Sequence, residues 1–146
     1  MPLLLLSFYT LAVGAGVSFV FQQAVNANLR GEIRSPWWAG FISYLGGTIA
    51  MFIMVLALRE PWPAVSQTSW ISWTGGIFGA IYIAVSILLL PRLGATIVVA
   101  LLVLGQMVGA MLFDHFALLG MPENSITPTR VAGVALLISG VVLIRL

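Results

Sequence analysis

Long apolar runs interrupted by few charges dominate this chain and constrain its fold more than any other feature. Five runs can be drawn, at about residues 2–29, 37–58, 70–90, 95–113 and 129–146. A helix of about 20 apolar residues crosses a bilayer core about 30 Å thick. Membrane strands would alternate apolar and polar residues over about 10 positions, whereas these runs are apolar on every face. We therefore expect an all-α membrane protein with five transmembrane helices.

The composition excludes several other classes of protein. Hydrophobic residues make up 61% of the 146 residues and charged residues only 7%, whereas a soluble domain is typically about 25% charged. Six scattered arginines and a net charge of +2 cannot form the basic stripe of a nucleic-acid binder. The chain has no cysteine, which excludes disulfides, thiolate metal sites and cysteine nucleophiles. We expect no cofactor and no metal.

The predicted boundaries rest on residues that stop helices and on the tryptophans. Pro61 and Pro63 follow the second run, and the segment Pro91-Arg92-Leu93-Gly94 predicts a tight turn before the fourth. A cleaved signal peptide is the alternative interpretation of the first run, but no positive segment precedes it. We expect one transmembrane domain over residues 1–146. All five tryptophans fall at proposed span ends, where indole rings prefer to lie: Trp37, Trp38, Trp62, Trp70 and Trp73.

The arginine distribution gives little preference for one orientation in the membrane. Five spans place the termini on opposite sides, with Arg59 and Arg130 on the N-terminal side. A difference of only two arginines favours the other side in the cytoplasm, so the chain inserts either that way or both ways. Because many transporters place their site between inverted repeats, and this chain has no internal repeat, an inverted second copy could supply one. The other side holds Arg30, Arg34, Arg92 and Arg145.

Uncharged polar residues within the runs are the candidate binding site. Ser18, Gln22 and Asn26 are spaced at i, i+4 and i+8, which places them on one helix face. A polar residue in the membrane is a functional candidate by default, although amides also join helices for about 1 kcal/mol. The two interpretations are about even for one residue, and the row of three favours a cavity. The further candidates for binding a small polar neutral or zwitterionic substrate are Ser43, Tyr82 and Gln106.

Acidic residues are absent from the middle of the predicted spans. The deepest acid is Asp114, near the end of the fourth run, which argues against a cation exchanger driven by a central carboxylate. Asp114 and His115 could relay protons at the membrane interface, but a helix-end anchor is the favoured interpretation. No paired carboxylates, phosphate-binding loop or catalytic serine motif is present, so we expect no enzyme.

Taken together in order, several short motifs resemble the YdcZ-like family of small bacterial inner-membrane proteins. That family belongs to the drug/metabolite transporter superfamily and is related to the small multidrug resistance exporters. The resemblance covers nearly the whole chain, from the first span to the last. It rests on Gln22-x-x-x-Asn26-x-x-Leu29-Arg30, Gly75-Gly76-x-x-Gly79, Pro91-Arg92-Leu93-Gly94-Ala95, Gly105-Gln106, Asp114-His115-Phe116 and Arg130-x-x-Gly133.

The resemblance implies a five-helix subunit equivalent to half of a ten-helix transporter. It implies an antiparallel homodimer, or a pair with a homologous subunit, with Gln22, Asn26 and Gln106 lining a cleft between the halves. The related exporters use a membrane glutamate in the first helix. This chain lacks one, so cationic drug export and simple proton antiport are not expected.

The expected function is therefore that of a subunit of a small secondary-active transporter or exporter in the bacterial inner membrane. Its expected partners are a second subunit, membrane lipids and a small-molecule substrate, without nucleic acid. Two alternatives stay open at this stage, a lipid flippase and a membrane assembly subunit that transports nothing.

Overall fold

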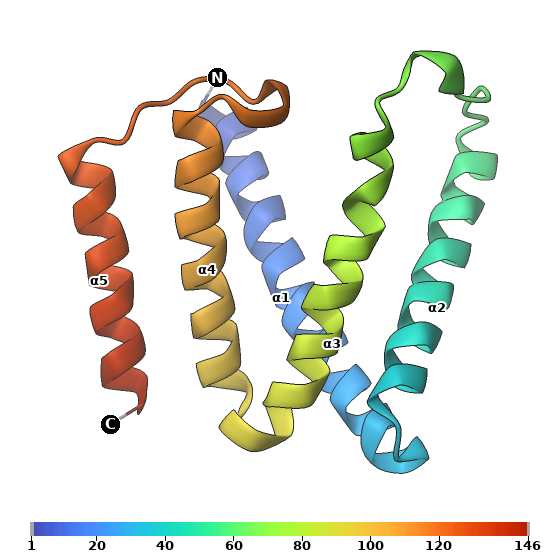
Figure 1. Ribbon diagram of the computed structural model, residues 1–146, viewed down its shortest axis with the longest axis horizontal. Coiled ribbons are helices and arrows are strands. Elements are labelled where there is room, and N and C mark those ends of the chain that lie inside the picture. Colours follow the sequence, from blue (N-terminus) through green and yellow to red (C-terminus); the bar gives the residue numbers. More distant parts are fainter. Residues whose placement is uncertain (1, 146) are drawn as a thin grey trace. The chain divides into compact units, whose positions relative to one another are not determined.

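A computed structural model describes residues 2–145 and confirms the all-helical prediction, since no strand occurs among these residues. Four helices are long and apolar enough to cross a membrane, and the fifth is a shorter apolar helix. The α-helices are α1 (Pro2–Ile33), α2 (Pro36–Ala57), α3 (Gly75–Leu93), α4 (Ala95–His115) and α5 (Pro128–Arg145) (Figure 1). Short 3-10 turns are η1 (Val65–Gln67), η2 (Trp70–Thr74) and η3 (Leu118–Gly120).

Helices α1 and α3 differ most from the sequence-based boundaries. The third run is predicted to begin at about residue 70, but η2 occupies Trp70–Thr74 and α3 begins at Gly75. Helix α1 continues to Ile33, well past the predicted end at residue 29. Its 32 residues span about 48 Å, so the helix exceeds the bilayer core and can carry a charged last turn. Helix α3 continues through Pro91 to Leu93, and the chain reverses at Gly94, where φ is +79°. The predicted turn over 91–94 is therefore wrong for its first three residues.

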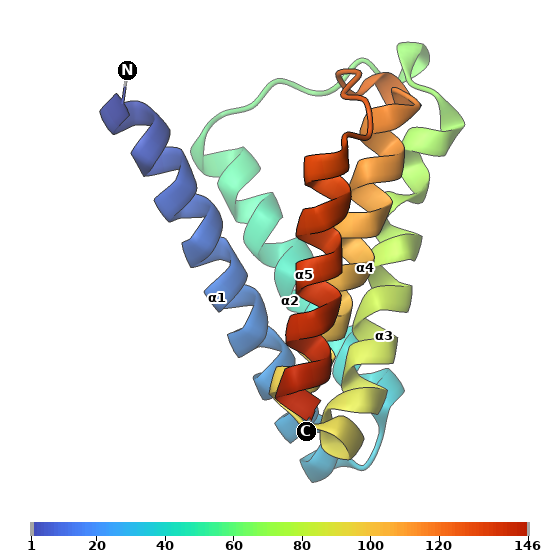
Figure 2. The ribbon, with the colours of Figure 1, turned by 90° about the vertical axis from the view of Figure 1, so that its left-hand side faces the viewer.

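Contacts between α-carbons divide the chain into two units, Met1–Arg92 and Leu93–Leu146. The assignment of residues 1–146 to one domain stays a prediction. In the first unit α1 packs directly against α2. The three helices converge at the end that holds the α1–α2 turn and the C-terminus of α3, and they diverge toward the other end (Figures 1 and 2).

Local sequence fixes the turn at which α1 and α2 meet. Ser35 caps α2, because its Oγ accepts a hydrogen bond from the backbone N–H of Trp38 at 3.3 Å, and Pro36 occupies the first helical position, where its missing N–H costs nothing. Arg34 precedes the cap with a positive φ of 55°. The two helices therefore reverse direction within a few residues.

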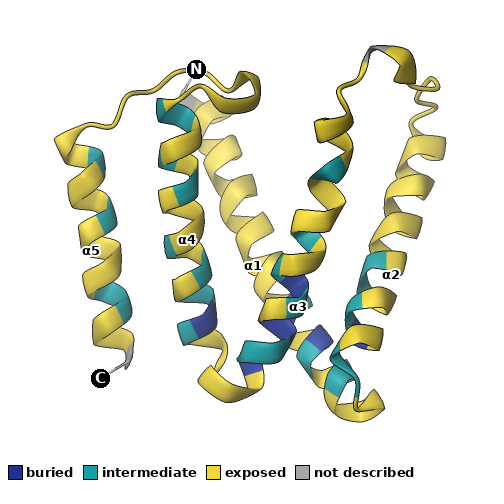
Figure 3. Ribbon diagram, viewed as in Figure 1, coloured by how far each residue is buried: buried dark blue, intermediate teal, exposed yellow. Residues whose placement is uncertain are grey.

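The core of the first unit lies at this convergent end. Ala39, Ile83 and Ile87 are buried together, and the buried residues of this unit gather there in Figure 3. Most large apolar side chains elsewhere are exposed, as Leu3 is at 81%. Such a surface suits hydrocarbon and would aggregate in water.

Glycine is needed where α2 faces α3. A Cβ atom at position 79 would overlap the hydroxyl of Tyr44. By contrast, a Cβ atom at Gly47, on the exposed part of α2, would meet nothing within 4 Å. The small residue at 79 therefore lets the Tyr44 side chain lie against α3, as small residues do at membrane helix contacts.

In the second unit α4 and α5 run antiparallel and pack side by side (Figures 1 and 2). Thr127 caps α5, because its Oγ1 accepts a hydrogen bond from the N–H of Arg130 at 3.3 Å, and Pro128 begins the helix. The predicted start of this span at residue 129 is therefore confirmed to within one residue.

Candidate functional site

Five polar side chains meet at the convergent end of the first unit, and we call them the amide cluster. Ser43 of α2 accepts two hydrogen bonds, from Gln22 Nε2 at 3.3 Å and from Asn26 Nδ2 at 3.0 Å. Gln23 Nε2 donates to the Tyr82 hydroxyl of α3 at 2.8 Å. Three helices thus contribute two neighbouring hydrogen-bonded sets, one between α1 and α2 and one between α1 and α3. The members of the amide cluster are Gln22, Gln23, Asn26, Ser43 and Tyr82.

Helix geometry explains how α1 reaches two neighbours at once. Gln22 and Asn26 are four residues apart and lie on the face that meets α2. Gln23 is rotated by about 100° from Gln22, which turns it toward Tyr82 on α3. Two of these amides are almost fully buried, with Gln23 at 4% and Asn26 at 5% exposed. The apolar surroundings raise the cost of leaving any of these groups unpaired.

The structure brings together four of the predicted site residues and adds one that was missed. Gln22 and Asn26 both donate to Ser43, and Tyr82 is bonded separately to Gln23, which is next to Gln22 on α1. The four-residue spacing that selected Gln22 and Asn26 passes over Gln23, which belongs to a different face. The signal that could have found it is its residue type, since an amide within an apolar span needs a partner.

The side chain of Gln23 has one hydrogen-bond acceptor to which no group within residues 2–145 donates. Its Oε1 is buried and has no hydrogen-bond partner among the described residues, although buried amide oxygens are normally paired. Next to it, the Tyr82 hydroxyl accepts from Gln23 and can still donate its own proton. This corner of the cluster therefore offers one acceptor and one donor to a further group.

The whole amide cluster is rich in uncharged hydrogen-bonding groups. Amide oxygens accept, and hydroxyl groups such as that of Ser43 both accept and donate. None of its five members is an acid or a base with a charge at neutral pH. The cluster can therefore recognise hydroxyl, amide or amine groups by hydrogen bonding, without attracting a net charge.

An arginine next to the cluster holds α1 against α3. Pro91 has no N–H, so the carbonyl of Ile87 one turn earlier loses its helical partner. Arg30 Nη1 donates a hydrogen bond to that carbonyl at 2.8 Å. Because Gln23 and Arg30 are seven residues apart on α1, they lie on the same face. The Arg30 contact thus fixes the register in which Gln23 meets Tyr82.

Three other predicted site residues lie outside the amide cluster. Ser18 is exposed on α1, one turn before Gln22, and takes no part in the hydrogen bonds of the cluster. The predicted row on α1 is therefore divided. Gln106 is exposed on α4, in the second unit. A role in substrate binding for either residue stays a prediction.

Asp114 takes part in a network at the end of the second unit. Its carboxylate lies 3.6 Å from Arg130 Nη1, and both side chains are 37% exposed. Arg130 also donates to the carbonyl of Asn124 at 3.1 Å, and the N–H of Asn124 donates to the carbonyl of Asp114 at 2.9 Å. These contacts tie the connecting segment to both helices, which favours the anchor interpretation of Asp114.

His115 lies beside this network. Its ring contacts Phe116, with centroids 4.8 Å apart, and its Nδ1 is buried without a hydrogen-bond partner among the described residues. A proton relay through Asp114 and His115 stays a prediction, since the contact found for Asp114 is with Arg130.

Comparison with known proteins identifies one family. The family model described as "Putative inner membrane exporter, YdcZ" matches residues 7–143, a range that reaches into all five helices. No curated protein and no solved structure matches the chain. The match agrees with the resemblance drawn from the sequence motifs.

Proposed function

The chain belongs to the YdcZ family of inner membrane exporters, and from this premise we propose that it is a subunit of a secondary-active transporter for a small polar, neutral or zwitterionic solute. Family membership and the apolar helices make it an inner-membrane protein with a transporter role. The observation that carries the proposed substrate class is the amide cluster, in which three membrane helices direct uncharged hydrogen-bonding groups at one another.

A transport screen tests the substrate class. The full-length protein is reconstituted in proteoliposomes and offered four labelled probes: glycerol, alanine, methyltriphenylphosphonium and lactate. We expect movement of a neutral or zwitterionic probe above the rate in empty vesicles, because the cluster offers hydrogen bonds and no charge. Movement of the cationic or the anionic probe alone would contradict the proposal.

We further propose that the working unit is an antiparallel homodimer. Support comes from the arginines of the first unit, which leave little bias in orientation. Arg30, Arg34 and Arg92 belong to the convergent end and Arg59 to the other end, so the two ends differ by only two arginines. A chain that inserts both ways can assemble the inverted pair that many transporters encode in one polypeptide.

Two opposite charge variants test this dimer without knowledge of the solute. Glu32→Lys raises the count in the first unit to four basic residues at the convergent end against one at the other end. The second variant combines Glu60→Lys, Ala64→Lys, Ser66→Lys and Arg92→Gln, which reverses the count to two against four. Each variant should therefore insert mainly one way. We expect two differently tagged copies of one variant to co-purify poorly, and one copy of each variant to co-purify at least as well as the unmodified chain. Equal co-purification in every combination would contradict the antiparallel arrangement.

A further inference from the structure

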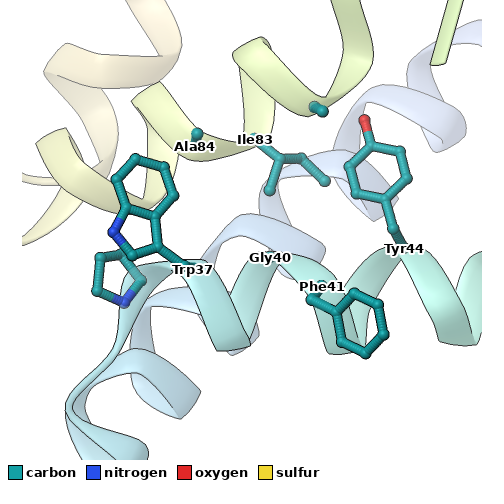
Figure 4. Close-up of a pocket in the computed structure, with 8 residues that line it drawn as sticks. Trp37, Gly40, Phe41, Tyr44, Ile83 and Ala84 are labelled. Carbon is teal, nitrogen blue, oxygen red and sulfur yellow. The ribbon is translucent and has the colours of Figure 1, made fainter. Parts of the chain in front are cut away.

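A second feature of the first unit is an apolar groove between α2 and α3, separate from the amide cluster. Its volume is about 300 Å³, at the lower end of the range of small-molecule pockets. In Figure 4, Trp37, Gly40, Phe41 and Tyr44 line one side, and Ile83 and Ala84 line the other. Pro36 and Ala80 complete the lining.

The groove exists because α2 and α3 stand apart here and the small residues that face the gap do not fill it. Across the described residues, no α-carbon of α2 lies within 8 Å of one in α3. Gly40 on one wall and Ala80 and Ala84 on the other leave the intervening space open. Even a Cβ atom at Gly40 would only reach ordinary contact, 3.7 Å from Ile83 Cγ2.

The residues that line this groove differ in chemistry from those of the amide cluster. Apart from the indole N–H of Trp37, the Tyr44 hydroxyl is its main polar side-chain group, and that hydroxyl lies against Gly79. Ser43, which anchors the amide cluster, is rotated by about 100° from Tyr44 on α2 and is not among the lining residues. A hydrocarbon chain fits such a lining, whereas a polar solute would lose its hydrogen bonds there.

Positive charge stands at the end of the groove that meets the membrane boundary. Pro36 and Trp37 belong to the first turn of α2, and Arg34 is only two residues before Pro36, at most about 7 Å along the chain. The Arg34 side chain is exposed, and so is Arg92 at the last turn of α3. Glu32, the acid at this end, accepts a hydrogen bond from Asn28 at 2.8 Å.

We propose that this groove holds one acyl chain of an anionic phospholipid whose phosphate lies at Arg34. The apolar walls select the chain, and the boundary arginine selects the charge of the headgroup. Trp37 is 68% exposed and stands where an indole ring meets both the glycerol region and the acyl chain. The proposal concerns a bound lipid and is independent of which solute the amide cluster takes.

Lipid titration of the delipidated full-length protein tests this site. Native mass spectrometry counts bound phosphatidylglycerol and phosphatidylcholine with identical acyl chains. We expect phosphatidylglycerol to bind about fivefold more tightly, because one arginine near a headgroup of net negative charge contributes about 1 kcal/mol, whereas choline offsets the phosphate charge of phosphatidylcholine. Arg34→Gln should remove that preference and weaken the binding of phosphatidylcholine much less than that of phosphatidylglycerol.

Groove-filling variants separate this site from general lipid contact. Ala80→Leu and Ala84→Leu place side chains in the groove from the same wall, and each should weaken binding of both lipids by about tenfold. Ala50→Leu, on an exposed part of α2 outside the groove, is the matched control and should bind like the unmodified chain. Unchanged lipid binding in both filled variants would overturn the proposal. So would loss of the dimer without loss of lipid, because the groove would then be a contact between subunits.

Discussion

Arg30→Met is expected to lower the free energy of unfolding by about 2 kcal/mol, because it leaves the buried carbonyl of Ile87 without a hydrogen-bond donor. Ile87 is 1% exposed, and Pro91 cannot supply the N–H that a helix normally offers to that carbonyl. Leaving one buried acceptor without a donor costs about 1–3 kcal/mol. Methionine keeps an apolar side chain against α3, so the expected loss comes from the hydrogen bond.

Pro91→Ala is the partner variant that identifies the cause. Alanine at 91 has an N–H that can bond the Ile87 carbonyl within α3, which makes the guanidinium of Arg30 redundant. We therefore expect Arg30→Met to cost less than about 0.5 kcal/mol in the Pro91→Ala background. Equilibrium unfolding in mixed detergent micelles measures all four proteins of this cycle.

Arg92→Met serves as the matched control for the loss of a positive charge. Arg92 is exposed in the same helix turn as Pro91, and its replacement should change stability by no more than about 0.5 kcal/mol. An equal cost of Arg30→Met with proline and with alanine at 91 would show that Arg30 stabilises the fold by some other contact.

The same pair of residues shows why the helix ends were harder to predict than the helices. A run of about 20 apolar residues indicates a helix surrounded by hydrocarbon, so the number and type of the secondary-structure elements could be predicted from the sequence. Pro91 was interpreted as a stop because it removes a hydrogen bond from its own helix. The replacement donor is Arg30, 61 positions earlier in the printed sequence, and no local pattern around Pro91 indicates it.

The candidate site was predictable to the extent that it follows helical spacing. Gln22 and Asn26 share a face, and both reach Ser43. Gln23 was missed because its importance depends on Tyr82, which lies on a different helix. Ser18 fits the spacing equally well yet stays exposed, because α1 and α2 meet at the later part of α1. A periodic pattern gives the face but not the length over which a neighbour covers it.

The charged residues near helix ends illustrate the same limit in the second unit. From the sequence alone, Asp114 next to His115 is compatible with a proton relay or with a helix-end anchor, and the anchor is favoured. In the folded chain the connecting segment brings Arg130 to Asp114, and Asn124 joins both. The structure thus adds what the sequence alone does not show, which is the partner of this acid on the next helix, and that contact supports the anchor interpretation.

Asn26→Leu is expected to reduce transport of the solute found in the proteoliposome screen by at least about tenfold while leaving a folded dimer. A solute that replaces Ser43 as the partner of this amide would lose that hydrogen bond and meet a buried apolar side chain, and discrimination by buried hydrogen-bonding sites reaches larger factors than this. In the folded chain leucine removes one of the two donors to Ser43, and Gln22 still supplies the other. The cost in stability should therefore stay near 1 kcal/mol.

Asn28→Leu is the matched control, because Asn28 is exposed and donates to Glu32 within α1. It should transport and assemble like the unmodified chain. Size-exclusion chromatography and initial transport rates, measured on the same preparations, distinguish a binding role from helix joining. If the amides only joined helices, Asn26→Leu would lose the dimer and transport together. If the variant formed a dimer that transports at the normal rate, Asn26 would not be part of the binding site.

Because Ser43 accepts hydrogen bonds from both amides, Ser43→Ala should show the same transport defect. Ser43→Thr keeps the hydroxyl group and should retain most of the transport rate.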